Sequence, residues 1–370
     1  MDNSLKIKPF FVGSNIFARE LFGKMHPLSG KRVSGVIELC QAMGWLKDED
    51  ITQSRAASFN TLSRFHDKQY ITAIKEADQA GMVSAQIRNK YCLGTMENPL
   101  FKGLYQRAAT TVGGSILAAQ LLKDGGTVYH PSGGTHHGRP DRASGFCYFN
   151  DPVFAILEFL DQGLKSVAYV DIDVHFGDGV QDAFEQEQRV HTFSIHEEKR
   201  WPYTGGLEDR GGGQSFNMPV PHGLNDTEFD YMLDQVVYSN LKRIKPQAIV
   251  ITLGADGLYG DPLSKMNLSN GALWRCVMNL RAMSPRTIIL GGGGYNPWTT
   301  LRCWAGMWGL LIGADLNAEL NSEARAVLNA LECDLIDEDE MENDWLSRIT
   351  DEPRTGDIRP SVIEVAAQAK

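Results

Sequence analysis

The chain has 370 residues, of which 42% are hydrophobic, 9% aromatic and 22% charged, a globular composition that excludes disordered and collagen-like proteins. Its 36 Lys and Arg against 46 Asp and Glu give a net charge of -10, so we expect neither direct nucleic-acid binding nor binding to an anionic membrane. No apolar run approaches the roughly 20 residues that span a bilayer, and the first residues lack the pattern of a secretory signal. The six cysteines are scattered, with no pair at CxxC spacing, which predicts free thiols and a cytoplasmic location.

The first 125 residues are expected to be mostly helical. Apolar residues at helical spacing run over residues 104–123, and Gly125-Gly126 is a strong stop signal. Asn150-Asp151-Pro152 predicts the start of another helix, because Asn or Asp caps the first amides and proline is tolerated in the first turn. We find no repeat, linker or low-complexity segment in the interior, so one domain over residues 1–370 is the simplest organisation.

Five short apolar runs, separated by helical patterns, predict a parallel sheet with crossover helices. These runs cover residues 127–129, 166–170, 190–195, 248–253 and 287–290. Each run is followed closely by residues that can take part in chemistry. In chain order these are His130, Asp171, His196, Asp256, and the glycines 291–294 with Tyr295. Because open α/β sheets bind ligands outside the carboxyl ends of their strands, we expect a site at this edge.

A metal site is the chemistry that this edge favours. Asp171, Asp173 and His175 alternate along a strand end and therefore point to the same side. Catalytic zinc takes three nitrogen or oxygen ligands and keeps a position open for water, so Asp256 is a candidate third ligand beside Asp173 and His175. The alternatives are a turn capped by Asp173 and a helix N-cap at Asp256.

His136 and His137 follow a glycine-rich stretch and are candidates to move protons near such a metal, unless they are simply surface residues. A carboxylate on a ring nitrogen would fix their tautomers, and Asp171 and Asp178 are the candidates. Gly291 to Gly294 lack the Lys-Ser/Thr of a P-loop, which leaves Tyr295 as an oxyanion donor or as a packed tyrosine.

Several other features are open or excluded at this stage. Phe146 and Trp201 lie in turn-rich segments and belong either to the core or to a substrate tunnel. Cys147 lies among aromatic residues and is expected to be buried rather than nucleophilic. No G-x-S-x-G elbow is present, so a serine hydrolase mechanism has no support.

The candidate residues described above, in their order along the chain, resemble the motifs of the zinc-dependent histone deacetylase superfamily. That superfamily includes bacterial acetoin-utilisation proteins and acetylpolyamine amidohydrolases. The resemblance runs from about His26 to Gly313, and its matching stretches are residues 136–137, 143–151, 171–180, 253–256, 260–262 and 291–296. It implies the arginase–deacetylase α/β fold, a central parallel β-sheet flanked by helices on both faces. It also implies a bacterial deacetylase that acts on an acylated lysine peptide or protein, or on a small acylated amine.

The resemblance implies a role for each candidate residue. Asp173, His175 and Asp256 hold zinc. His137 is the main general base and acid, His136 is its electrostatic partner, and the two form dyads with Asp171 and Asp178. Tyr295 stabilises the oxyanion. The residues implied to bind substrate are Glu97 at the rim, Gly145, Phe146, Trp201 and Leu263 along the channel, and Arg32 near an acetate exit. The residues implied to hold a structural potassium ion are Asp171, Asp173, His175, Ser194 and Ile195.

The chain departs from the family at two positions, of which Phe176 is expected to affect packing more than chemistry and Trp201 puts the substrate in question. Phe176 stands where many relatives carry a second histidine, and Trp201 replaces a commoner tunnel phenylalanine. The competing functions are a non-catalytic acyl-lysine binder and an arginase-like dimanganese hydrolase, which needs a denser carboxylate cluster. Iron(II) fits the same ligands as zinc. The sequence leaves the oligomeric state open, and a homo-oligomer is one of the alternatives. Between residues 332 and 344, eight of thirteen residues are acidic, which is typical of a solvated surface segment.

Overall fold

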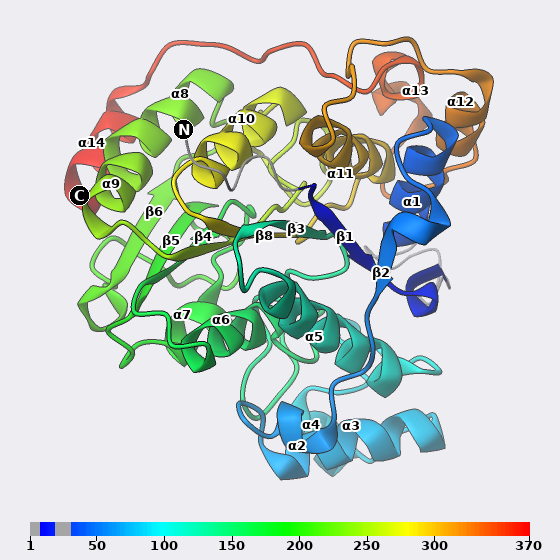
Figure 1. The fold of residues 1–370 in the computed structure, drawn as a ribbon, viewed down its shortest axis with the longest axis vertical. Coiled ribbons are helices and arrows are strands. Elements are labelled where there is room, and N and C mark those ends of the chain that lie inside the picture. The colour runs from blue at the N-terminus through cyan, green and yellow to red at the C-terminus, as the bar shows by residue number, and fades with distance from the viewer. Residues whose placement is uncertain (1–7, 19–30) are drawn as a thin grey trace.

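The centre of the molecule is an eight-stranded sheet in which every neighbouring pair of strands is parallel (Figure 1). The computed structural model describes residues 8–18 and 31–370, so the first residues and His26, where the family resemblance begins, lie outside this part. The strand order is β2-β1-β3-β8-β7-β4-β5-β6. The strands are β1 (Phe10–Gly13), β2 (Ile51–Gln53), β3 (Gly126–His130), β4 (Val167–Asp171), β5 (Val190–Glu197), β6 (Ser215–Val220), β7 (Ala248–Thr252) and β8 (Arg286–Leu290).

The five predicted strands are confirmed as β3, β4, β5, β7 and β8. The described part of the first 125 residues is mostly helical, as expected, but the sequence prediction missed the short strands β1 and β2 there, and β6 later in the chain. β2 has only three residues and β6 carries Asn217 and Pro219, so neither shows a continuous apolar run. Both are edge strands, where short length and proline are tolerated.

Helices cover both faces of the sheet, as predicted (Figure 1). The figure shows α5, α6 and α7 on one face, and α1, α8, α9, α10, α11 and α14 on the other. The helices are α1 (Val33–Ala42), α2 (Phe59–Leu62), α3 (Lys68–Ala80), α4 (Ala85–Tyr91), α5 (Leu104–Leu121), α6 (Asp151–Asp161), α7 (Asp178–Ala183), α8 (Asp226–Met232), α9 (Ser239–Ile244), α10 (Asn270–Arg281), α11 (Pro297–Leu311), α12 (Ser322–Asn329), α13 (Asp344–Ser347) and α14 (Pro360–Ala369).

Alternation along the central strands produces two cores. Val170 and Ile251 belong to the cluster beneath α1, α10 and α11, whereas Tyr169 and Val250 belong to the cluster beneath α5 and α6. Because successive side chains of a strand point to opposite faces, a strand that is apolar throughout must be covered on both. The sheet is therefore a rigid, buried platform, and its chemistry is displaced to the loops at the strand ends.

Local signals in the sequence set the ends of α5 and α6. The α5 helix ends at Leu121, and Gly125 and Gly126 adopt φ angles of 98° and 113°, which favour glycine. The α6 helix begins as predicted, since the Asn150 side chain accepts a hydrogen bond from the backbone N–H of Val153 at 3.3 Å. These two helices flank the segment that carries His136 and His137.

Three further sequence predictions concern the acidic segment, the cysteines and membrane-spanning helices. In the acidic segment 332–344, Asp334, Asp337, Asp339 and Glu340 are exposed, while the apolar Ile336 packs against the core. All six cysteines are free thiols. Over residues 8–18 and 31–370, no helix has the length and apolar character needed to cross a membrane.

Candidate metal centre

The predicted site residues come together at the carboxyl edge of the sheet. The loop after β3 carries His136 and His137, the end of β4 leads to Asp173 and His175, the segment after β7 carries Asp256, and the glycines after β8 lead to Tyr295. Strands β3, β8, β7 and β4 are neighbours in the sheet, so these four loops are adjacent. The sheet topology thus assembles residues that lie up to 159 positions apart in the sequence, as His136 and Tyr295 do.

Asp173, His175 and Asp256 form a buried cluster in which one potential ligand atom of each lies within 4.8 Å of the others. His175 Nδ1 is 3.2 Å from Asp173 Oδ1 and 3.0 Å from Asp256 Oδ2. Backbone N–H groups orient the carboxylates, because Gly293 donates to Asp173 Oδ2 at 2.5 Å and Val174 donates to Asp256 Oδ1 at 3.1 Å. The turn-capping alternative is also partly realised, since the His175 N–H donates to Asp173 Oδ1 at 2.9 Å.

The surroundings of this cluster fit a divalent metal. Two carboxylates and one imidazole are the nitrogen and oxygen donors of a catalytic zinc site, and they leave a coordination position open. A Cβ atom added at Gly293 would lie 2.1 Å from Asp256 Oδ2, and one added at Gly292 would lie 2.9 Å from Asp173 Oδ2. The glycines therefore let the backbone approach the carboxylates closely, which a larger residue would prevent.

His136 and His137 each donate to a buried carboxylate. His136 Nδ1 is 2.7 Å from Asp171 Oδ2, and His137 Nδ1 is 2.8 Å from Asp178 Oδ1. The two imidazole centroids are 3.9 Å apart, and that of His137 is 6.1 Å from that of His175. With Nδ1 donating, the Nε2 atom of a neutral ring is the nitrogen available to accept a proton.

The pKa values of the two histidines are pushed in opposite directions. Burial disfavours the charged form of His136, but the negative charges of Asp171 and Asp173 outweigh it and raise its pKa to about 9. Burial and the positive charge of His136 lower the pKa of His137 to about 4, against the opposing effect of Asp178. Because the two pKa values differ in this way, His137 is a neutral base that lies beside a positively charged His136.

Tyr295 lies near His175 of the cluster and near Phe146. Its ring centroid is 6.2 Å from that of His175 and 6.0 Å from that of Phe146. Burial, followed by the charges of Asp256 and Asp173, raises the pKa of Tyr295 well above its usual value. The phenol therefore keeps its proton and remains a hydrogen-bond donor.

A cleft leads to this cluster from the surface. It is lined by the predicted Glu97, Gly145, Phe146, Trp201 and Leu263, together with His137, His175 and Tyr295. The Trp201 ring stands edge-on to His137 at 4.6 Å, so it forms part of the cleft wall rather than of the core. Glu97 accepts a hydrogen bond from the Gly145 N–H at 2.6 Å and so fixes the turn that presents Phe146.

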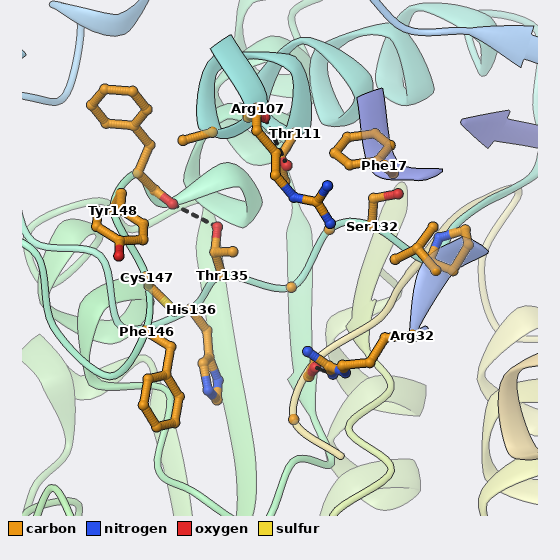
Figure 2. Close-up of a pocket in the computed structure, with 18 of the residues that line it drawn as sticks. Phe17, Arg32, Arg107, Thr111, Ser132, Thr135, His136, Phe146, Cys147 and Tyr148 are labelled. Atoms are coloured by element: carbon orange, nitrogen blue, oxygen red, sulfur yellow. Dashed lines mark hydrogen bonds between the residues drawn. The ribbon is translucent and has the colours of Figure 1, made fainter. Parts of the chain in front are cut away.

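Arg32 lies in a second, inner cavity of about 160 Å³ behind the cluster (Figure 2). Its Nη2 atom donates to the backbone oxygen of Gly292 at 2.6 Å. His136, Gly293 and Tyr295 also line this cavity, which places Arg32 on the inner side of the candidate metal centre.

The residues implied for potassium lie beside the metal cluster. Asp171 in β4 pairs with Ser194 in β5, which is followed by Ile195. The Ser194 hydroxyl lies 2.9 Å from His196 Nδ1, and Asp171 accepts hydrogen bonds from His136 and from the Asp173 N–H. The potassium ion stays a prediction.

Phe176, a departure from the family, packs against His196 with ring centroids 5.0 Å apart.

Sequence reasoning missed several residues that support the site. Asp261 accepts from the N–H groups of Tyr295 and Leu263 at 2.7 and 2.9 Å, and it stands in a block, residues 260–262, that the family pattern had already marked. Arg139 pairs with Asp178 and Asp182. No spacing signal identifies Arg139, because its partners come from a helix 39 or more residues away.

Comparison with known proteins identifies the family and the fold of the chain. Residues 26–311 match the model of the histone deacetylase domain. The chain is 34% identical over 320 residues to histone deacetylase 8 of Xenopus tropicalis, covering 84% of this chain and 86% of that protein. It is 33% identical over 335 residues to the acetoin utilization protein AcuC of Bacillus subtilis (strain 168), covering 85% and 84% of the two chains.

Among solved structures, that of a histone deacetylase homologue from Aquifex aeolicus is similar, with a TM-score of 0.92 and 32% identity, covering 98% of this chain and all of that one. A histone deacetylase homologue complexed with SAHA also has a TM-score of 0.92, at 31% identity. The arginase–deacetylase fold predicted from the sequence is thereby confirmed.

Proposed function

Because the chain belongs to the histone deacetylase family, whose members are hydrolases of the deacetylase class, we propose that it hydrolyses the amide of an acylated lysine or amine with a bound divalent metal. One observation carries this proposal. A buried Asp173–His175–Asp256 cluster, two carboxylate-oriented histidines and a protonated tyrosine surround one point at the base of a cleft. Zinc is the metal we propose, since three nitrogen and oxygen ligands with one open position are typical of catalytic zinc.

The substrate enters with its amine side in the cleft. Phe146 and Trp201 provide apolar walls for an alkyl chain, and Glu97 stands at the rim, where the substrate backbone would pass. A metal held by Asp173, His175 and Asp256 would polarise the amide carbonyl and lower the pKa of a bound water to about 7.

The proton transfers belong to the histidines. His137, neutral and held in one tautomer by Asp178, accepts a proton from the attacking water and then delivers it to the leaving amine. His136, whose Nδ1 donates to Asp171, stands beside it as the electrostatic partner. The Tyr295 hydroxyl donates a hydrogen bond to the oxygen that becomes negative as water adds.

The alternatives make different demands on the site. A non-catalytic binder needs no metal ligand set, histidine pair or tyrosine, yet all are present in one place. A dimetal arginase-like site needs more carboxylates, and Asp173, His175 and Asp256 are the one group with metal-ligand geometry that the described residues contain. A small acylated amine such as an acetylpolyamine fits the same cleft as a peptide.

We propose a cytoplasmic location, in keeping with the free thiols.

The proposal is tested with purified protein and an acetyl-lysine peptide, alongside an acetylpolyamine. We expect turnover that a chelator abolishes and that one equivalent of Zn²⁺ per chain restores. An Asp256→Asn variant should bind metal weakly and remain inactive after zinc addition. Zinc-loaded protein that hydrolyses neither substrate would contradict the proposal, and a requirement for two metal ions per chain would favour the arginase-like alternative.

A further inference from the structure

Beside the cleft lies an ion pair that the proposed reaction does not use. Glu197 is the last residue of β5, and its carboxylate is fully buried. Arg200 binds one oxygen of this carboxylate through Nε and Nη2, and His222 Nδ1 lies 2.8 Å from the other oxygen. The Lys265 N–H donates to that second oxygen at 3.1 Å. A buried carboxylate is stable only with such partners, so Glu197 brings three segments of the chain together.

Arg200 also joins two parts of the cleft to each other. Arg200, His222 and Leu263 all line the cleft. Arg200 Nη1 donates to the backbone oxygen of Leu263, so this side chain bonds both to the end of β5 and to the segment after β7. A guanidinium can serve two acceptors at once because its five N–H donors lie in one fixed plane. The spacing between the loop that carries Arg200 and the segment that carries Leu263 is therefore set by one side chain.

The loop to which Arg200 belongs, residues 198–206, carries an aromatic wall of the cleft. Trp201 follows Arg200 directly, and its ring stands edge-on to His137 at 4.6 Å. A Cβ atom added at Gly145 would lie 2.5 Å from Trp201 Cη2, so the ring also packs closely on that backbone. A small displacement of the loop would therefore move this ring relative to His137.

The backbone of this loop needs outside contacts to keep its shape. Lys199 and Tyr203 adopt φ angles of 56° and 63°, in the left-handed region that residues other than glycine rarely occupy. Such conformations persist only where the surrounding structure holds them. The far end of the loop is held by His196, whose Nε2 donates to the Gly205 oxygen at 2.9 Å. Arg200 provides the anchor between the two left-handed residues.

We propose that Arg200 is a positioning residue, which the Glu197 carboxylate holds in place and which fixes Trp201 at the cleft for substrate binding. Arg200 acts through Trp201 and not on the reacting atoms. By bonding to the Leu263 backbone, it also keeps that segment at a constant distance from Trp201, and so sets the space that the substrate chain enters. The inference rests on the proposed function, because it takes Trp201 as a wall of the substrate cleft.

Kinetics with an acetyl-lysine peptide give the first test. Arg200→Met keeps an aliphatic stem but loses both sets of hydrogen bonds, so we expect KM to rise about tenfold while kcat stays within about threefold. Zinc content should be unchanged, and Arg200→Lys should restore part of the affinity. Glu197→Gln/Arg200→Met leaves no unpaired buried charge and gives a second test should Arg200→Met fold poorly. Arg189→Met is the matched control and should leave KM unchanged, because Arg189 binds Glu187 through the same two nitrogens next to the opposite end of β5.

A double-mutant cycle separates positioning from a general structural role. If Arg200 acts through Trp201, Arg200→Met should change KM by less than about twofold in the Trp201→Ala background. A change of about tenfold in both backgrounds, or a fall in kcat at unchanged KM, would overturn the inference.

Hydrogen–deuterium exchange of the chain without substrate distinguishes this inference from the proposed function. Arg200→Met should exchange faster over residues 198–206 and 263–266, whereas Arg189→Met should match the unmodified chain. Faster exchange in both segments supports the inference even if no peptide is hydrolysed, in which case the proposed function alone fails. Unchanged exchange in the two segments would overturn the inference whether or not the chain is active.

Discussion

The Nδ1 atom of His137 lies 2.8 Å from Oδ1 of Asp178, and Arg139 binds the other oxygen of the same carboxylate. Asp178 is therefore held between a cation and an imidazole, and despite its burial the pKa of its carboxyl is lowered by His137 and Arg139. It stays ionised as a hydrogen-bond acceptor, which fixes Nδ1 of His137 as the protonated nitrogen. The basic Nε2 nitrogen is left for the reaction.

Replacing Asp178 tests this orientation. Asp178→Asn keeps the shape but can present an N–H to Nδ1, which favours the wrong tautomer, and we expect kcat to fall about 10²- to 10⁴-fold. Asp182→Asn is the matched control, since Asp182 also pairs with Arg139 but its side chain is 60% exposed. The control should retain activity within about threefold. Steady-state kinetics of both variants decide the matter, and equal losses would show that Arg139 pairing, not the His137 tautomer, is what Asp178 provides.

Tyr295 is expected to act on the reaction without holding the metal. Removal of one oxyanion donor typically costs about 10²- to 10³-fold in kcat, so Tyr295→Phe should lose activity to that extent. Its metal content, measured by elemental analysis, should equal that of the unmodified chain. Tyr259→Phe provides the control, because Tyr259 is 41% exposed. Full turnover by Tyr295→Phe would remove the oxyanion role.

The glycines after β8 give a prediction about the metal site itself. Gly293→Ala places a Cβ atom 2.1 Å from Asp256 Oδ2, so the carboxylate or the backbone has to shift. We expect the metal to dissociate at least about tenfold more readily, measured by competition with a calibrated chelator. Gly206→Ala is the control, because a Cβ there meets nothing within 4 Å. Unchanged metal affinity in Gly293→Ala would mean that the cluster does not hold the ion.

His66 gives a prediction about stability and pH. It is buried, its Nδ1 donates to the Arg139 oxygen at 2.9 Å and its Nε2 accepts from the Asn150 N–H at 3.1 Å, so it supports the loop that carries the histidine pair. Burial lowers its pKa to about 3, below the 6.5 of an unfolded histidine. The unfolded state therefore binds the proton first, and the stability that His66 contributes is present above pH 6.5 and is lost as the pH falls toward 3.

In that window we expect the protonation of this residue to lower the free energy of unfolding by about 1.4 kcal/mol per pH unit. His66→Gln should be less stable at pH 7 but should show a shallower decline between pH 6.5 and 4.5, measured by urea unfolding. Parallel curves for the two proteins would assign the acid sensitivity to other groups.

Local patterns in the sequence were sufficient for much of the fold. The apolar runs of β4, β7 and β8 have no polar face that would have to meet solvent. Such a run is typical of a central parallel strand that is covered on both sides, and so it could be predicted from the sequence. The cap at Asn150 and the glycines at 125 and 126 are local backbone requirements, which one segment expresses by itself. The edge strands β2 and β6 were missed because their stability comes from a neighbouring strand.

The candidate site divides in the same way. Strand alternation placed Asp171, Asp173 and His175 together, and positions after a strand or a glycine-rich stretch made Asp256, His136 and Tyr295 candidates. The family resemblance then implied a role for each of them. The tertiary structure alone decided that Arg139 shares Asp178 with His137, that Trp201 stands against His137, and that Arg107 from α5 and Arg32 line the same inner cavity. Charges and aromatic rings act through space over a few ångströms, and only the packed sheet and its helices bring these segments within that range.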